Sequence, residues 1–392
     1  MMSFELGSLE EVLSQRPLPI FEDSIIEMLS TLSSQILKES SSRDFPALMA
    51  LGFWLRKGNL INQQHRYVSE RHLFGRGLSL HFPPSNVPLN TAYSLVLGLV
   101  SGNTCLIRLP SQEHLELEMF VDHLTEVLSK DDFRLVKRRI CLVRYPHDEV
   151  LTGQLSLLAD ARVIWGGDAS VSSLRRFPTK PRCVDLCFAD RISLTLLHGE
   201  SVEACDDSAL RSLCDRFYAD SYTFSQNACS SPRLVVWHGA TEVGRSRFWN
   251  ELNHNGRSRR VLPPIQITDR FVALSEYLAS SAQKTSVTGV GSVALRLAHN
   301  NATRWPEAAS IGSGTFSETL ISELSELAEY LSDRVQTISY FGYSDADAVA
   351  NELEQSSTFF DRLVPIGEAL SFDFAWDGYD SLRMITHKIS VI

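Results

Sequence analysis

Residues 81–110, HFPPSNVPLNTAYSLVLGLVSGNTCLIRLP, decide the fold of this chain. They begin at the end of a short apolar run, 78–82, which two prolines terminate. The run 89–99 is apolar on nearly every side, which is typical of a helix covered by other elements. Gly102 supplies the left-handed residue that ends such a helix, and 104–109 reads as a buried strand. Strand, helix and strand in this order predict a βαβ crossover.

The same alternation of strands and helices continues along the chain. Further predicted strands cover 139–144, 162–165, 184–188, 192–197, 234–237, 337–340 and 362–364. Predicted helices cover 24–38, 45–54, 112–130, 148–158, a short stretch from Ser170, 208–222, 245–252, 269–282, 318–332 and 345–354. This pattern predicts an α/β protein with parallel, doubly wound sheets. We expect a helical N-terminal segment over 1–75, one α/β domain over 76–205 and a second over 206–364, with 365–392 returning to the first.

Composition narrows the class of protein. The 392 residues carry a net charge of −10, which argues against an electrostatic nucleic-acid binder. No run reaches the roughly 18 continuous apolar residues of a membrane span. The N-terminus is acidic and lacks the pattern of a signal peptide. Seven cysteines, without a CxxC pair, suit a reducing compartment and give no metal-binding pattern. We expect a soluble, cytoplasmic protein.

The loop before the first apolar helix is a candidate ligand site. It follows a strand at the carboxyl edge of the predicted sheet, where open α/β sheets bind ligands. Asn86 lies between prolines, and it either caps the next helix or presents its amide to a ligand. Gly166 and Gly167 stand between a strand and a helix, where they either face a pyrophosphate or simply make a tight turn.

Cys229 differs from the other six cysteines. It lies in SQNACSSPR, a polar loop between a predicted helix and a predicted strand. A thiol in such a loop can have a depressed pKa and can be reached by substrate. The residues alone leave two interpretations open, a catalytic thiol and an ordinary loop cysteine.

Three stretches together resemble the luminescence-type fatty acyl reductases, the LuxC family, which are distant members of the aldehyde dehydrogenase superfamily. These are FPPSNVPLNTAYSLVLGLVSGNTCLIRLPS, SQNACSSPR and FDFAWDGYDSLR. The resemblance covers most of the chain from about Leu73 onward. It implies an aldehyde-dehydrogenase-like fold, in which 76–205 binds NADP and 206–364 carries a catalytic cysteine.

The resemblance also implies roles for individual residues. Cys229 matches the nucleophile, and the side-chain amide of Asn86, with the Cys229 backbone N–H, matches the donors that stabilise an oxyanion. Arg108 matches the position that contacts the adenosine ribose, where an arginine suits the 2′-phosphate of NADPH. Ser85, Gly166 and Gly167 complete the cofactor-binding candidates. The basic cluster 257–260 either meets CoA phosphates or forms a solvated loop.

One departure from the superfamily affects the reaction. Where acid-forming aldehyde dehydrogenases carry a glutamate base, this chain reads VDLCFADR, with Asp185 in that neighbourhood. Asp185 is either a base or a structural residue at a strand end. A missing base fits a reductive enzyme, which must avoid hydrolysing its thioester.

The reaction implied is NADPH-dependent reduction of an acyl-CoA or other acyl thioester, such as an acyl-protein, to the aldehyde through an acyl-cysteine. Two alternatives stay open: a non-redox acyltransferase or thioesterase, and a non-catalytic subunit that holds an acyl chain. The resemblance further implies a partner ligase that activates the acyl group, and a homo-oligomer.

Overall fold

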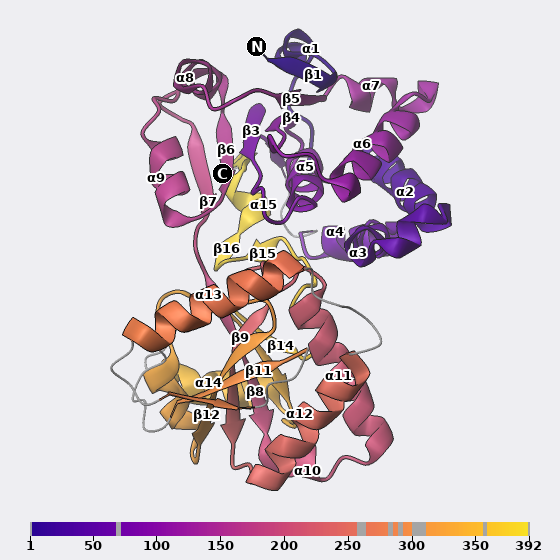
Figure 1. Ribbon diagram of the computed structural model, residues 1–392. Coiled ribbons are helices and arrows are strands. Elements are labelled where there is room, and N and C mark those ends of the chain that lie inside the picture. Colours follow the sequence, from indigo (N-terminus) through magenta and orange to yellow (C-terminus); the bar gives the residue numbers. More distant parts are fainter. Residues whose placement is uncertain are drawn as a thin grey trace. The chain divides into compact units, whose positions relative to one another are not determined.

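The structure is a computed structural model, and it describes residues 2–67, 72–256, 264–280, 285–288, 293–299, 311–355 and 359–390. The chain divides into two compact units (Figure 1). The first comprises 1–190 together with 372–392, and the second comprises 191–371. None of the helices formed by the described residues combines the length and the apolar character needed to cross a bilayer.

A six-stranded sheet forms the centre of the first unit. Its strands are β1 (Ser3–Leu6), β3 (Leu78–Phe82), β4 (Thr104–Arg108), β5 (Ile140–Arg144), β6 (Ala161–Trp165) and β7 (Val184–Phe188). They lie in the order β1-β5-β4-β3-β6-β7, and all neighbours are parallel except β1 and β5. The five parallel strands therefore have the chain order 3-2-1-4-5, which is the doubly wound pattern predicted from the sequence.

Helices cover both faces of this sheet. They are α1 (Leu9–Ser14), α2 (Asp23–Lys38), α3 (Pro46–Trp54), α4 (Lys57–His65), α5 (Asn90–Val100), α6 (Leu115–Leu128), α7 (Arg134–Lys137), α8 (Glu149–Leu158) and α9 (Asp168–Arg175), with short 3-10 turns η1 (Ser41–Asp44) and η2 (Asp131–Phe133). Figure 1 shows α8 and α9 on one side of the strands and α2, α5 and α6 on the other. Ten of the eleven residues of α5 are buried, as its apolar sequence predicts.

The end of α5 shows why Gly102 is required there. Gly102 has φ +81°, and a Cβ at this position would lie 2.0 Å from the Leu18 carbonyl oxygen. The next residue, Asn103, is fully buried, and its Oδ1 accepts the backbone N–H groups of Arg76 and Gly77 at 2.6 and 3.1 Å. The sequence-based assignment of this turn is confirmed.

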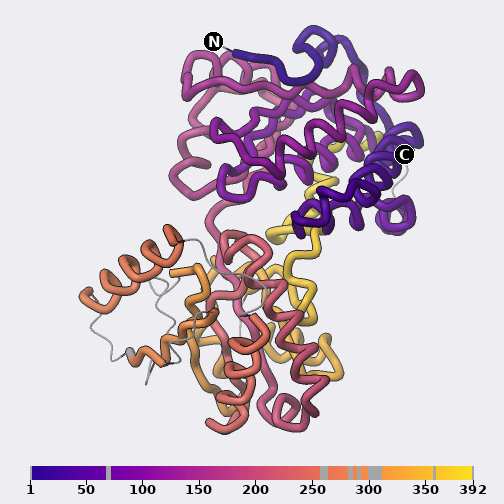
Figure 2. The backbone as a smooth tube through the Cα atoms, turned by 45° about the vertical axis from the view of Figure 1, so that its right-hand side comes forward, coloured from indigo at the N-terminus to yellow at the C-terminus, as the bar shows by residue number. Residues whose placement is uncertain are grey.

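The C-terminal segment completes the first unit. It contains β15 (Ala375–Trp376), β16 (Tyr379–Asp380), α15 (Ser381–Met384) and β17 (Thr386–Lys388). β17 pairs antiparallel with β2 (Leu73–Gly75). Figure 2 shows this yellow segment returning to the indigo and purple N-terminal half. Aromatic rings of the N-terminal helices and the C-terminal segment pack together, and the ring centroids of Trp54 and Phe372 lie 5.3 Å apart.

A seven-stranded sheet forms the centre of the second unit. Its strands are β8 (Ile192–His198), β9 (Pro232–His238), β10 (Thr285–Thr288), β11 (Leu295–His299), β12 (Thr315–Ile321), β13 (Val335–Phe341) and β14 (Arg362–Pro365), in the order β10-β11-β12-β9-β8-β13-β14. β10 is antiparallel to β11, and the other neighbours are parallel. Its helices are α10 (Gly199–Glu203), α11 (Asp207–Tyr222), α12 (Glu242–Gly256), α13 (Pro264–Ser280) and α14 (Ala346–Gln355), with a 3-10 stretch η4 (Leu324–Tyr330).

Alternation along β9 creates a core on each face of this sheet. Val235 and Trp237 pack on one face with residues of α11 and α12. Leu234 and Val236 pack on the other with residues of η4 and α14. A strand that is buried on both faces reads as a continuous apolar run, as LVVW does here.

The helix predicted over 318–332 is wrong. The structure has the buried strand β12 followed by η4. The charged residue Glu318 is 3% exposed, and its Oε1 accepts hydrogen bonds from Trp237 Nε1 and Trp249 Nε1, both at 2.8 Å. Buried tryptophan donors supply the partners that an inward-facing carboxylate needs, and single-sequence periodicity cannot show them.

The boundary between the units also differs from the expected one at 205. It falls between Asp190 and Arg191, because β8 pairs with β9 and β13 of the second sheet. The basic cluster 257–260 lies outside the described residues, which end here at Gly256, the last residue of α12.

Candidate active site

A cleft of about 570 Å³ lies at the carboxyl edge of the first sheet. It is lined by Phe82, Pro83, Pro84, Ser85, Asn86, Arg108, Leu109, Pro110, Ser111, Gln112, Trp165, Gly166, Gly167, Ser170 and Leu174. All five residues of the first unit that the sequence singled out as binding or catalytic candidates are in this set. The cleft sits where β3 adjoins β6, at the switch point of the doubly wound sheet.

Asn86 does not cap the helix that follows it. α5 begins at Asn90 with Leu89 as the N-cap residue, and no side chain caps its first turn. The backbone N–H of Asn90 instead donates to the Val87 carbonyl at 3.0 Å. Asn86 is exposed in the cleft. Of the two interpretations of Asn86 that the sequence left open, the helix cap is therefore not observed.

Arg108 ends β4 and gives the cleft its positive charge. Its guanidinium carbon lies 4.7 Å from the ring centroid of Tyr145, and Nη2 donates to the Tyr145 carbonyl at 3.4 Å. Its Nε is buried and has no hydrogen-bond partner among the described residues. No acidic side chain is among the residues that line the cleft. This combination suits a phosphate-bearing ligand.

A smaller cavity of about 300 Å³ adjoins the cleft, because the two share Arg108, Ser170 and Leu174. The smaller cavity is lined further by His147, Glu149, Thr152, Ala169, Ser173 and Phe177. Arg108 thus lies at the junction of a continuous depression at this edge of the sheet.

Gly166 and Gly167 form the turn from β6 into α9, and Gly167 is the N-cap residue of that helix. A Cβ on Gly167 would lie 3.0 Å from Asp190 Oδ2. Asp190 accepts the Asp168 N–H at 3.1 Å, and Asp168 accepts the Asp190 N–H at 3.1 Å. These reciprocal bonds fix the first turn of α9 beside the cleft.

Trp165 is a cleft residue that the sequence reasoning did not single out. Its ring stacks on Phe188 with centroids 3.7 Å apart, and its Nε1 donates to Ser94 Oγ at 3.1 Å. Ser94 lies 2.7 Å from Nδ1 of the fully buried His81. The position of Trp165, as the last residue of a buried strand before Gly-Gly, was the signal available in the sequence.

His81 is neutral and has one defined tautomer. Ser79 Oγ donates to the Thr104 carbonyl at 2.8 Å, so His81 Nε2 donates to Ser79 at 2.7 Å. His81 Nδ1 then accepts from Ser94. Burial lowers the pKa of His81 to about 3. A directed chain of hydrogen bonds therefore runs from the cleft wall into the sheet and fixes the indole of Trp165.

Cys229 lies in the second unit, in the loop between α11 and β9. It is the one exposed cysteine of the seven, all of which lie in described ranges and none of which forms a disulfide. Burial raises the pKa of the other six thiols, that of Cys105 to about 12. The sequence-based distinction between Cys229 and the other cysteines thus corresponds to a real difference in environment.

Buried side chains hold the Cys229 loop. Ser225 and Gln226 both have positive φ, at 53° and 59°, a conformation that costs free energy for residues other than glycine. Gln226 is fully buried, and its Nε2 donates to the Pro232 carbonyl at 3.0 Å while its Oε1 accepts the Gly314 N–H at 2.6 Å. Gln226 therefore supplies the bonds that stabilise the strained turn.

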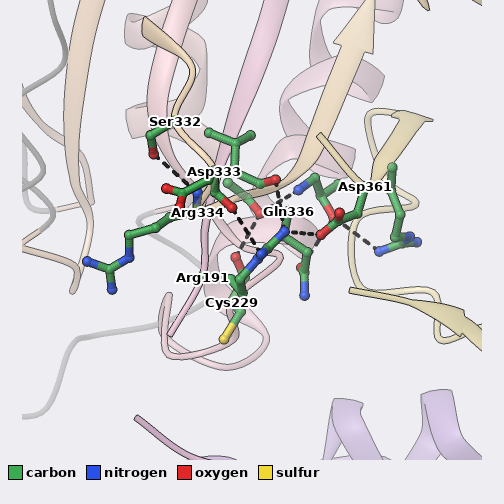
Figure 3. A network of polar contacts seen from close by, with 11 residues as sticks. Arg191, Cys229, Ser332, Asp333, Arg334, Gln336 and Asp361 are labelled. Atoms are coloured by element: carbon green, nitrogen blue, oxygen red, sulfur yellow. Dashed lines mark hydrogen bonds and ion pairs between the residues drawn. The ribbon is translucent and has the colours of Figure 1, made fainter. Parts of the chain in front are cut away.

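The backbone of Cys229 is fixed separately from its side chain. Ser193 Oγ donates to the Cys229 carbonyl at 2.7 Å and accepts the Thr337 N–H at 3.1 Å. Figure 3 shows the sulfur pointing away from the ion pair between Arg191 and Asp361. The thiol is thus presented outward from a rigid backbone, which is what a nucleophile requires.

Asp185 occupies a structural position. Arg162, which is 2% exposed, donates to both of its carboxylate oxygens at 2.7 and 2.6 Å. Asp185 lies near the amino end of β7, in register with Arg162, whereas the cleft lies at the Trp165 end of β6. This bidentate ion pair favours the structural alternative over a general base.

The described residues contain no group of three or more His, Cys, Asp or Glu side chains suited to a metal ion. Solved structures with a similar fold define the architecture. A putative aldehyde dehydrogenase from Burkholderia cenocepacia matches with a TM-score of 0.61 and 11% identity, over 93% of this chain and 83% of that one. Glyceraldehyde-3-phosphate dehydrogenase GapN from Methanocaldococcus jannaschii, solved with NADP, matches with a TM-score of 0.63 and 11% identity, over 93% and 88%. The fold is therefore that of the aldehyde dehydrogenases, as predicted.

The sequence places the chain more narrowly. Residues 56–305, more than half of the chain and inclusive of every candidate site residue, match the acyl-CoA reductase (LuxC) family, and the chain belongs to that family. Long-chain acyl-protein thioester reductase from Aliivibrio fischeri is 24% identical over 235 residues, which are 59% of this chain and 44% of that protein. The protein of the same name from Vibrio harveyi is 28% identical over 171 residues, 42% and 33% of the two chains. The match thus spans less than half the length of either relative.

Proposed function

We propose that this protein reduces a long-chain acyl thioester to the aldehyde with NADPH, through an acyl intermediate on Cys229. The observation that carries the proposal is the cleft at the switch point of the first sheet, where Ser85, Asn86, Arg108, Gly166 and Gly167 come together. Family membership and the exposed thiol of Cys229 support it further.

The cleft fits a pyridine dinucleotide phosphate. The turn at Gly166 and Gly167 would face the pyrophosphate, and Arg108, with its unpartnered buried Nε, would meet the 2′-phosphate. A carboxylate in the cleft would repel that phosphate, and none is among its lining residues. When bound, the reduced nicotinamide supplies the hydride for the reaction.

Cys229 carries the covalent part of the proposed reaction. Its thiolate attacks the acyl carbonyl, a C–S bond forms, and the carrier thiol leaves with a proton. The thioester on Cys229 then accepts hydride at the same carbon, and collapse of the adduct releases the aldehyde and restores the thiolate. Splitting the reaction in two in this way is the purpose of a covalent nucleophile.

Stabilisation of the oxyanion is assigned to Asn86 and to the backbone N–H of Cys229. One such donor contributes roughly 3 kcal/mol to the lowering of the barrier. Asp185 is held by Arg162 in a bidentate ion pair near the amino end of β7, away from the cleft, so it is not placed to activate water there. A thioester that is not hydrolysed persists until hydride is transferred to it, which supports a reductase rather than a thioesterase.

The substrate class follows the relatives, which are named as acting on long-chain acyl-protein thioesters. We propose an acyl thioester on a protein or on CoA as the acyl donor. A partner ligase that activates the acyl group, and assembly into a homo-oligomer, are parts of the same proposal.

The test is a spectrophotometric assay with the purified protein, myristoyl-CoA and NADPH. We expect NADPH oxidation that depends on the acyl-CoA, with one aldehyde formed per NADPH. Release of CoA without loss of NADPH would show a transferase or thioesterase instead. A protein that forms neither product, yet carries a stable acyl group on Cys229, would be an acyl-holding subunit.

A further inference from the structure

In the proposed reaction Cys229 acts as a nucleophile only when its thiol is ionised to the thiolate. An ordinary cysteine has a pKa of about 8.5, so only a few per cent is ionised near neutral pH. A cation beside the sulfur lowers this value, and thiolates in enzymes are commonly stabilised in this way. The surroundings of Cys229 therefore decide how reactive it is.

Arg233 is the candidate for this cation. It follows Cys229 by four residues and is the second residue of β9. Its Nη2 donates to the Gln226 carbonyl at 2.7 Å, which ties the guanidinium to the loop that carries the thiol. Gly312 also lies beside the guanidinium, and a Cβ at this position would be in ordinary van der Waals contact with Nη1, at 3.4 Å.

The charges of Arg233 and Cys229 interact. Burial lowers the pKa of Arg233, and the neighbouring Cys229 raises it. Such coupling is reciprocal, because a thiolate that stabilises a guanidinium is stabilised by it to the same extent.

Other ionisable groups around the loop are engaged elsewhere. Asp220, on α11, directs its two oxygens to the backbone N–H groups of Gly367 and Ala369, at 2.7 and 3.1 Å. Arg191, the residue before β8, pairs with Asp361, the residue before β14, and the sulfur of Cys229 points away from that pair (Figure 3). From β8 the loop receives a neutral contact, through the hydroxyl of Ser193, which also accepts the N–H of Thr337 on β13.

We propose that Arg233 is a positioning residue that holds Cys229 in its thiolate form, and that Gln226 fixes Arg233 for this task. The role assigned to the thiolate rests on the proposed function. The electrostatic claim does not, because it concerns the ionisation of one thiol in the protein without substrate.

Alkylation by iodoacetamide tests the claim directly. The rate constant for modification of Cys229 is measured from pH 5 to 10 without acyl substrate or cofactor, and the site is identified by peptide mass. We expect the wild-type midpoint to lie below about 8.5. In Arg233→Gln the midpoint should rise by about one pH unit or more, and in Arg233→Lys it should stay near the wild-type value.

The control is Arg296→Gln, which removes another arginine of the second unit, one that pairs with Glu318. It should leave the midpoint unchanged. Equal midpoints in wild type and Arg233→Gln would overturn the inference, as would equal shifts in Arg233→Gln and Arg233→Lys, which would indicate a scaffold role without electrostatics. If Arg233→Gln does not fold by circular dichroism, a wild-type midpoint at or above 8.5 still refutes the inference. A protein inactive as a reductase can pass this test, so the two proposals fail separately.

Discussion

Both units contain a doubly wound parallel sheet, but their candidate functional groups lie at opposite edges of the respective sheets. In the first sheet five parallel strands lie in the chain order 3-2-1-4-5, with β3 as the first strand, and in the second sheet six parallel strands lie in the chain order 3-4-2-1-5-6, with β8 as the first strand. The first unit collects its candidate groups at the carboxyl edge, where β3 and β6 meet. The second unit presents Cys229 at the amino edge, three residues before β9 begins. Its own carboxyl edge carries instead a cavity of about 390 Å³ lined by His198, His238 and Tyr343 among others.

The difference shows what each edge demands of the sequence. At a carboxyl edge the loops lead into helices, so backbone N–H groups of the first turn are available and glycine suffices, as at Gly166 and Gly167. At an amino edge the loop follows the end of a helix, and its shape must be imposed by side chains. Gln226 does so here, in a left-handed conformation that its buried hydrogen bonds offset.

The largest expected effect concerns the amino-edge residue. Cys229→Ala should lower reductase turnover by at least about 10⁴-fold, because removal of a covalent nucleophile removes the reaction path. NADPH binding, followed by calorimetric titration, should not change. Cys205→Ala, which changes a half-buried thiol outside the loop, is the matched control. Acylation that persists in Cys229→Ala would refute the assignment.

Buried ionisable groups should give the two units opposite pH dependence. Unfolded His81 takes a proton near 6.5 and folded His81 near 3, so the first unit loses stability as pH falls through this window. Burial raises the pKa of Asp220 to about 7, against about 3.9 when unfolded, so the second unit loses stability as pH rises from about 4 to 7. The His81 window changes the free energy of unfolding by up to about 5 kcal/mol, and the Asp220 window by up to about 4 kcal/mol.

Hydrogen exchange read by mass spectrometry separates the units, and the sign of each slope is the measurement. Asp220→Asn should flatten the slope of the second unit and leave that of the first. Slopes of the same sign in both units would contradict the assignment of these groups.

A smaller effect is expected at the carboxyl edge from Asn86. Asn86→Ala should lower the rate of acyl transfer to Cys229 by about 10²- to 10³-fold, because an oxyanion donor is lost. Asn90→Ala, on the first turn of α5, is the control and should retain the rate. Quenched-flow detection of the released carrier thiol measures this step, and an unchanged burst rate would remove Asn86 from the mechanism.

The smallest effect is a change of cofactor preference. Arg108→Ala should weaken NADPH binding by about 10- to 100-fold and NADH binding little, because a charge-assisted bond to the 2′-phosphate contributes roughly 1.5–3 kcal/mol. Arg138→Ala, an exposed arginine 3.9 Å from Glu11, is the control. Calorimetric titration with each nucleotide gives the ratio, and an equal loss for both would show that Arg108 does not read the phosphate.

Much of the secondary structure of the first unit could be predicted from the spacing of apolar residues and from the residues that end helices and strands. The apolar run of α5 and the turn at Gly102 are local features, and both are found as predicted. The stretch around Glu318 could not be read in this way. Its strand depends on tryptophans 69 and 81 residues away, so the information that makes it buried is not local.

The sequence by itself determined that the chain is doubly wound α/β, that it resembles the LuxC family, and that Cys229 differs from six other thiols. These conclusions rest on residue type and short-range spacing, which are already present in the unfolded chain. The tertiary structure decided that Asn86 faces a cleft, that Asp185 is held by Arg162, and that Arg233 and Gln226 accompany Cys229. Each of these depends on which partner side chains and strands meet, and only packing fixes that.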